Sequence, residues 1–150
     1  MAGYSGTPLV RKLGIKQDHL LALLDAPEGW TIEGLPESVA VRRRARGTVD
    51  VIVAFFRRRA ALERRLPALL EAARSDGSVW IAWPRKAAGH SSDISENLLR
   101  ELILPTGLVD VKVAALDEDW SGLKFVWRKE LRPALAARAQ AAAPAGRPAS

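Results

Sequence analysis

Two apolar runs in the middle of the chain predict two strands of a sheet that is covered on both faces. Residues 49–56 are apolar on both alternating faces apart from Asp50, and residues 79–83 read V-W-I-A-W. Strands that are buried on both faces give such near-continuous apolar runs. Between them, leucines recur at the helical period from Leu62 to Leu70, with Pro67 inside the pattern. This stretch predicts a strand, a crossover helix that Pro67 kinks or restarts, and a parallel strand.

Three segments precede this unit. Thr7 can cap a short helix that runs from about Pro8 to Leu13, because proline fits the first helical position. Residues 18–25 read D-H-L-L-A-L-L-D, which predicts a central strand. Residues 39–43 predict a short edge strand, where the arginines discourage pairing with other chains.

The second half of the chain continues the alternation of strands and helices. The S-D-G sequence at 75–77 predicts a break in the chain ahead of the second central strand. A helix is expected from a cap at Ser92 or Asp93 to about Leu104. Two strands of alternating pattern follow between residues 108 and 128, and they predict an antiparallel hairpin.

The order of these elements predicts one α/β domain over residues 1–130. Its sheet is expected to be mainly parallel and doubly wound, with the antiparallel hairpin at its C-terminal end. In the 20 residues from 131 on, 12 are alanine or proline. This composition predicts that residues 131–150 form a disordered tail, with a frayed helix at its start.

Composition excludes several classes of site. The chain of 150 residues contains no cysteine and only two histidines, which excludes disulfides and thiol chemistry and argues against a structural zinc site. No apolar run is long enough to cross a membrane, and the N-terminus does not resemble a signal peptide. We therefore expect a cytoplasmic protein with no metal and no membrane partner.

Positive charge is concentrated in one part of the chain. Residues 41–74 carry ten arginines against three acidic residues, within a chain of net charge +6. Such a surface can attract phosphates or an acidic partner. Nucleic-acid binding through the arginines of residues 42–65 is one alternative, and a solvated helix face is the other.

The carboxyl ends of the predicted parallel strands give the first set of candidate site residues. Ligands of such sheets bind beyond these ends. Asp25 and Glu28 follow the first strand, and Trp83, Arg85 and Lys86 follow the second central strand. These residues predict a site for a partner or a small anionic ligand. The alternatives are turn chemistry for the two acids, core packing for the indole and solvation for the two cations.

Two further features allow more than one interpretation. Ser5, Gly6 and Thr7 precede a predicted helix and offer backbone N–H groups to an anion, although an ordinary helix cap explains them as well. Trp120 lies in the predicted turn of the final hairpin. It either folds back on the core or contacts a ligand. No motif around these residues or around His90 predicts a catalytic group.

The second half of the chain resembles the class I methyltransferase fold, which is Rossmann-like. The resemblance rests on strand 49–56, the helix after it, the G-S-V-W-I-A-W-P strand, another helix and the final hairpin. It implies a sheet with the following strand order: 39–43, 18–25, 49–56, 78–83, 122–128 and 108–116.

The same resemblance implies an S-adenosylmethionine site after the first strand. There the chain has D-A-P-E-G-W in place of a glycine-rich loop. Arg42, Arg43 and Arg44 replace the acidic residue that would hold a ribose. We therefore expect no cofactor, and a degenerate S-adenosylmethionine-dependent methyltransferase is kept as an alternative.

A second resemblance covers the chain to about residue 130. The sequences Y-S-G-T-P-L-V-R-K-L-G-I, L-L-D-A-P-E-G-W, W-I-A-W-P-R-K and D-E-D-W-S-G-L-K-F-V are similar to a bacterial family known as a domain of unknown function. That family implies no activity, cofactor or catalytic residue. The sequence thus predicts a small α/β protein without catalysis, which binds a protein or a small anionic ligand.

Overall fold

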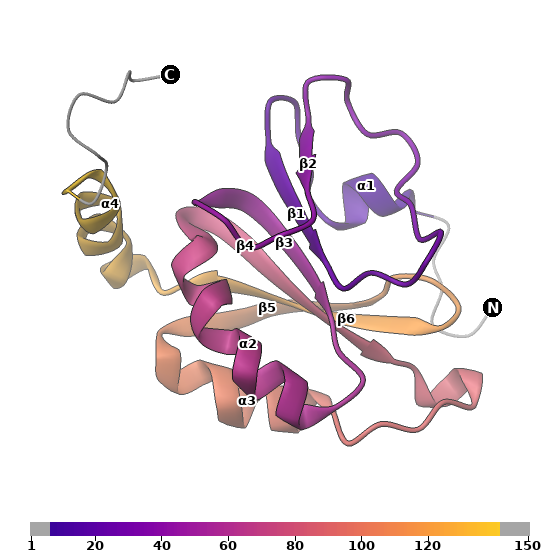
Figure 1. Cartoon of the computed structure of the whole chain (residues 1–150). Coiled ribbons are helices and arrows are strands. Elements are labelled where there is room, and N and C mark those ends of the chain that lie inside the picture. The colour runs from indigo at the N-terminus through magenta and orange to yellow at the C-terminus, as the bar shows by residue number, and fades with distance from the viewer. Residues whose placement is uncertain (1–6, 142–150) are drawn as a thin grey trace.

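One six-stranded sheet carries the fold of this protein, whose computed structural model describes residues 7–141 (Figure 1). The strands are β1 (Leu20–Leu24), β2 (Ala40–Arg42), β3 (Val49–Phe55), β4 (Ala73–Pro84), β5 (Leu108–Ala115) and β6 (Trp120–Trp127). Their order across the sheet is β2-β1-β3-β4-β6-β5. The first four are parallel, and β6 runs antiparallel to β4 and to β5. The predicted fold class and strand order are confirmed.

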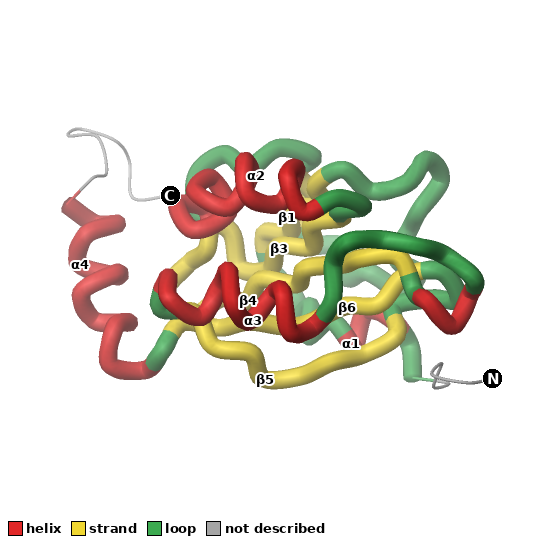
Figure 2. The backbone as a smooth tube through the Cα atoms, turned by 90° about the horizontal axis from the view of Figure 1, so that it is seen from below, coloured by secondary structure: helices red, strands yellow, loops and turns green. Residues whose placement is uncertain are grey.

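The two faces of the sheet are covered unequally. The described helices are α1 (Leu9–Lys12), α2 (Arg59–Ala72), α3 (Glu96–Ile103) and α4 (Arg132–Ala141). Leucines of α2 and α3 complete the core on one face, as Leu62 and Leu99 illustrate. The core of the opposite face is closed by α1 and by the irregular segments around it, through Leu13, Ile15 and Ile32. The helix α4 stands at one end of the sheet (Figure 2).

The predicted break at 75–77 is wrong, because β4 begins at Ala73 and runs through it. The pairing of β3 with β4 shifts register between Val49 and Val51, which marks a bulge. Gly77 makes this possible, since a Cβ atom there would lie 2.6 Å from the carbonyl oxygen of Asp50. The glycine therefore serves a close approach of two backbones within the sheet, rather than a turn.

The loop before α3 caps two different helices. The cap of α3 is Ser95, whose Oγ accepts a hydrogen bond from the backbone N–H of Leu98 at 3.2 Å, so the prediction of Ser92 or Asp93 is wrong. The Asp93 carboxylate instead accepts the backbone N–H of Arg59, the first residue of α2, at 2.7 Å. This cross-connection ties the start of α2 to the loop that follows β4. It fixes the backbone at the carboxyl end of β3.

Other boundaries differ less from the expectation. The helix α2 is continuous, so Pro67 does not restart it. The helix α1 has Pro8 at its N-cap and no side-chain cap, which corrects the predicted role of Thr7. Residues 25–39, between β1 and β2, contain no helix.

Part of the predicted tail has a described structure. The helix α4 places Leu135 against the core, whereas residues 142–150 lie outside the described part of the chain. No helix within residues 7–141 is long and apolar enough to span a membrane.

Candidate functional site

A cleft of about 500 Å³ opens at the carboxyl ends of β1 and β3. The chain leaves β1 toward β2 on one side and leaves β3 toward β4 on the other. The cleft therefore lies at the point where the winding of the sheet reverses, which is where open α/β sheets bind ligands. Its lining residues are Asp25, Pro27, Phe55, Phe56, Arg57, Arg58, Ala61, Arg64, Arg65 and Trp120.

Aromatic rings form the inner wall of this switch-point cleft. Phe55, the last residue of β3, packs edge-on against Trp120 with ring centroids 5.0 Å apart. The Trp30 ring also packs edge-on against the Phe55 ring, with centroids 4.8 Å apart. Trp120 is 6% exposed, and it belongs to the core while it also lines the cleft. The interpretation that Trp120 folds back on the core is therefore confirmed, and its contact with a ligand stays a prediction.

Four arginines surround the wall. The Arg57 guanidinium lies over the Trp120 ring, 4.9 Å from its centroid, which is a cation–π arrangement. Arg65 forms an ion pair with Asp25 at 2.8 Å. Within residues 7–141, no hydrogen bond or ion pair engages the side chains of Arg58 and Arg64. The cleft carries four positive charges against one carboxylate, which favours an anion.

The backbone conformation of Asp25 directs its carboxylate into the lining of the cleft. Asp25 directly follows β1 and adopts a left-handed conformation with φ of 58°. Asp and Asn tolerate this conformation better than most residues. The predicted partner carboxylate, Glu28, is exposed and does not line the cleft. Acid–base chemistry by a pair of carboxylates therefore has no support in the geometry.

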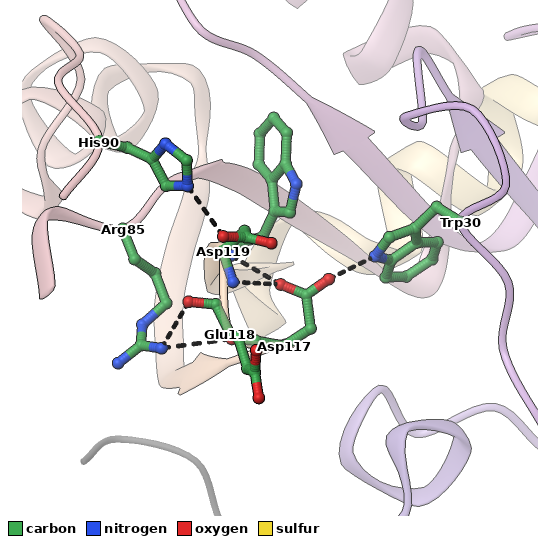
Figure 3. A network of polar contacts seen from close by, with 7 residues as sticks. Trp30, Arg85, His90, Asp117, Glu118 and Asp119 are labelled. Atoms are coloured by element: carbon green, nitrogen blue, oxygen red, sulfur yellow. Dashed lines mark hydrogen bonds and ion pairs between the residues drawn. The ribbon is translucent and has the colours of Figure 1, made fainter. Parts of the chain in front are cut away.

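The Asp117 carboxylate organises the turn between β5 and β6 and lies close to Trp30 (Figure 3). The Asp117 carboxylate accepts the backbone N–H groups of Asp119 and Trp120, both at 2.7 Å, through one oxygen. Its other oxygen accepts the indole N–H of Trp30 at 2.9 Å. One side chain thus joins the turn to the loop after β1, 87 positions earlier in the chain.

The predicted ligand residue Arg85 also supports this turn. Its guanidinium donates to the carbonyl oxygen of Glu118 at 2.8 Å, and its backbone N–H donates to that of Asp119 at 2.8 Å. His90 contacts the Asp119 carboxylate at 2.9 Å. The loop after β4 is therefore fastened to the hairpin turn, as Figure 3 shows.

The structure divides the predicted site residues between three surroundings. Asp25 lines the switch-point cleft, whereas Arg85 and Lys86 line a separate depression of about 380 Å³ beside β5. Trp83 is 8% exposed and belongs to the core that α2 and α3 cover.

The predicted N-terminal anion site is only partly described. Ser5 and Gly6 lie outside the described residues, and Thr7 is exposed. The sequence places Arg64 and Arg65 on a candidate nucleic-acid surface, and it does not connect them with Asp25 and Trp120 in one cleft. The arginines lie one turn inside α2, and no local pattern distinguishes them from a solvated helix face.

The residues available to a metal ion are few. No group of three or more His, Asp or Glu side chains within residues 7–141 is arranged to hold one. The remaining arginines of the predicted nucleic-acid surface are exposed at β2 and in the loop after it, where Arg42 donates to the carbonyl oxygen of Arg46 at 2.7 Å.

Comparison with solved structures finds proteins of similar fold, among them SAM-dependent methyltransferases. A SAM-dependent methyltransferase from Aquifex aeolicus has a TM-score of 0.55 and 14% identity, over 78% of this chain and 86% of that one. A TehB-like SAM-dependent methyltransferase from Corynebacterium glutamicum has a TM-score of 0.54 and 11% identity, over 80% and 85%. The fibrillarin pre-rRNA processing protein of Methanococcus jannaschii has a TM-score of 0.52 and 14% identity, over 83% and 70%.

These similarities concern the fold. No protein-family model matches the chain, and no curated protein matches it in sequence. The bacterial domain family that the sequence motifs resemble therefore stays a prediction.

The residues of the cleft fit S-adenosylmethionine poorly. Its sulfonium is a cation, and the cleft presents four guanidinium groups to it. The only carboxylate in the lining, Asp25, already pairs with Arg65. The segment after β1 has no helix, and its two glycines, Gly29 and Gly34, are separated by four residues and do not form a glycine-rich loop. No step through this cofactor is supported by the geometry.

Proposed function

We propose that this protein binds a small anionic ligand with a planar ring in the switch-point cleft, and that it does not catalyse a reaction there. The observation that carries the proposal is the arrangement of four arginines around an aromatic wall at the carboxyl ends of β1 and β3. Cleft volumes of about 300–1,000 Å³ suit small molecules, and this cleft has about 500 Å³.

The aromatic rings and the arginines of the cleft offer different interactions to a ligand. Phe55, Phe56 and Trp120 offer apolar surface to the body of a ligand. Arg58 and Arg64 offer guanidinium groups that suit phosphate or carboxylate oxygens and that do not have to leave another partner among residues 7–141. A nucleoside phosphate combines both chemistries in one molecule.

The residues that line the cleft support a non-catalytic role. Among the lining residues, none is a histidine, lysine, serine or threonine, and the single carboxylate is paired with Arg65. General acid–base or nucleophilic catalysis needs at least one such group within reach of the substrate. The cleft can hold and orient an anion, but it offers no group that moves a proton.

A second candidate is a degenerate S-adenosylmethionine-dependent methyltransferase, which the shared strand order and the solved neighbours favour. Against it stand the positive charge of the cleft and the missing glycine-rich loop. Fold alone does not assign this activity.

One titration series separates the two candidates. Adenosine, adenosine 5′-monophosphate and S-adenosylmethionine share the same ring and ribose, and they differ in charge. Binding is measured by isothermal titration calorimetry on the whole chain at low salt. We expect the monophosphate to bind at least about tenfold more tightly than the other two, because a charged hydrogen bond contributes about 1.5–3 kcal/mol. Tighter binding of S-adenosylmethionine would reverse the assignment.

A matched pair of double variants locates the effect. Arg58→Ala/Arg64→Ala removes two charges from the cleft, and Arg43→Ala/Arg44→Ala removes two exposed charges beside β2. The cleft variant should lose binding of the monophosphate, and the β2 variant should keep it. Equal losses in both would show that the ligand senses only the overall charge.

A further inference from the structure

Four lysines gather on the sheet face that α1 covers, away from the switch-point cleft. Lys112 of β5 lies directly opposite Lys124 of β6. Lys124 pairs on its other side with Trp80, whose ring belongs to the core of this face. The lysine patch comprises Lys12, Lys16, Lys112 and Lys124.

The C-terminal end of α1 packs beside the strands that carry Lys112 and Lys124. Lys12 is 6% exposed, and its Nζ donates to the carbonyl oxygen of Ala115, at the end of β5, at 2.8 Å. Gly14, which ends α1 with φ of 76°, leaves the Lys124 ammonium group only 3.6 Å from the position of a Cβ atom. The ammonium groups of α1 and of the hairpin are thus brought together by the fold itself.

Burial and neighbouring positive charges both lower the pKa of two members of the lysine patch. The pKa of Lys124 is lowered by burial and by the charges of Lys112 and Lys16. The pKa of Lys12 is lowered by burial and by the charge of Lys112. Lys112 is therefore the common neighbour that joins the patch.

Three lysines of the patch have no ion pair with an acidic side chain among the described residues. Within residues 7–141, no ion pair joins Lys16, Lys112 or Lys124 to an Asp or Glu. The rest of the chain cannot supply such a side chain, because residues 1–6 and 142–150 contain neither Asp nor Glu. The fold itself does not require a lysine at the exposed positions 16 and 112, where neutral residues would be accepted as readily.

We propose that the lysine patch is a second anion site, which binds a phosphate or diphosphate group. Lys112 and Lys124 lie directly opposite each other, and the Lys124 ammonium group lies beside Gly14 at the end of α1. A compact multivalent anion can contact several such neighbouring cations at once, whereas an extended polyanion needs cations spread along a line. The site is separate from the switch-point cleft in position and in its residues, and it does not depend on the function proposed there.

The test uses pyrophosphate on the whole chain at constant ionic strength, with sodium chloride as the balancing salt. Two-dimensional ¹H–¹⁵N NMR of the wild type should show saturable shifts at the backbone amides of Gly14, Lys112 and Lys124. Thermal unfolding should shift upward by about 5 °C or more at a hundredfold excess over Kd. Lys112→Met/Lys124→Met should abolish the NMR shifts at the patch and reduce the thermal shift, and Lys129→Met, at an exposed lysine outside the patch, should keep both as in the wild type.

The controls separate this site from the cleft and from general screening. Arg58→Ala/Arg64→Ala should leave the pyrophosphate shifts at the patch unchanged. If chloride at equal ionic strength produced the same stabilisation, or if the NMR shifts appeared only around the cleft, the second site would be refuted. A titration with adenosine 5′-diphosphate in place of pyrophosphate then distinguishes the two sources of the phosphate group. Shifts at the patch would indicate a diphosphate that is part of a larger molecule. No shifts with adenosine 5′-diphosphate, where pyrophosphate does produce them, would indicate the free ion.

Discussion

The carboxyl edge of the sheet has two halves that use their cations differently. At the ends of β1 and β3, Arg58 and Arg64 line a cleft without a hydrogen-bond partner among residues 7–141. At the ends of β4 and β5, Arg85 is bound to the backbone carbonyl of Glu118. The sequence motif around Arg85 is the more conspicuous of the two. The Arg85 guanidinium nevertheless supports the hairpin turn, whereas Arg58 and Arg64, which belong to no conspicuous motif, line the cleft.

This difference shows how the two halves depend on each other. The turn that Arg85 and Asp117 hold together carries Trp120, and Trp120 forms one wall of the switch-point cleft. The half around β4 thus acts as a scaffold, and the half around β1 and β3 acts as the binding surface. Variants in the first should change stability, and variants in the second should change affinity.

The largest effect is expected from Asp117→Ala. The change removes the acceptor for two backbone N–H groups and for the Trp30 indole. Hydrogen bonds of this kind contribute about 0.5–1.5 kcal/mol each, and an unsatisfied donor adds to the loss. We expect the free energy of unfolding to fall by about 2–3 kcal/mol in urea denaturation. Glu118→Gln, whose side chain is exposed, is the control and should be unchanged; equal stability of both variants would contradict the scaffold role.

Arg64→Ala and Arg85→Ala should separate the two halves in opposite ways. Arg64→Ala is expected to weaken binding of adenosine 5′-monophosphate about fivefold to tenfold, with stability changed by less than about 0.5 kcal/mol. Arg85→Ala is expected to cost about 1 kcal/mol of stability and to change affinity less than about twofold. Calorimetric titration and urea denaturation give both numbers for each variant. The comparison fails if Arg85→Ala loses more affinity than Arg64→Ala.

Asp25→Asn should strengthen binding. It releases Arg65 from its ion pair, and asparagine tolerates the left-handed backbone at this position. Because both partners are about half exposed, the pair itself contributes at most about 1 kcal/mol, and stability should change little. Affinity for the monophosphate should rise about twofold to fivefold, since a competing carboxylate is removed. A loss of affinity would place the Asp25 carboxylate on the ligand, and Glu28→Gln is the control for the change of charge.

The smallest effect concerns the lysine patch, which lies outside both halves of the edge. Burial and neighbouring cations lower the pKa of Lys124 in the folded state. The folded state therefore releases this proton at lower pH than the unfolded state does. The free energy of unfolding should rise with pH from the lowered pKa up to the ordinary lysine pKa of about 10.4, and should be flat below that window.

Urea denaturation across this alkaline range measures the slope. Lys124→Met should reduce it, and Lys129→Met should leave it as in the wild type. A slope that is identical in all three proteins would mean that Lys124 carries no penalty for its charge.

The strands were predictable from their own apolar patterns, whereas their order followed from the resemblance to the class I methyltransferase fold. The runs at 49–56 and 79–83 are apolar on both faces, and the exposed arginines of β2 agree with an edge position. The start of β4 was not predictable, since the role of Gly77 depends on the backbone of Asp50 across the sheet. A glycine in a bulge and a glycine in a turn look the same in sequence.

A residue of the candidate site was predictable only where it directly follows a predicted parallel strand, since ligands of such sheets bind at the carboxyl ends of the strands. Asp25 was found in this way. Trp30 and Asp117 are 87 positions apart, and no local pattern connects them. The same limit explains Arg85, whose hydrogen-bond acceptor lies in a turn 33 positions later. Contacts between distant segments decide which cations remain available to a ligand.

The most direct test of the switch-point cleft is a ¹H–¹⁵N NMR titration with adenosine 5′-monophosphate, read at the five tryptophan indoles. The indoles of Trp80 and Trp127 donate to the carbonyl oxygens of Leu13 and Ala73 inside the core, so they serve as internal references. We predict saturable shifts for the indoles of Trp30 and Trp120 and for the backbone amides of Arg57, Arg58 and Arg64, with Trp80 and Trp127 unmoved. No shift of Trp120 at millimolar monophosphate, or shifts confined to the depression at Arg85 and Lys86, would contradict a binding site at the switch point.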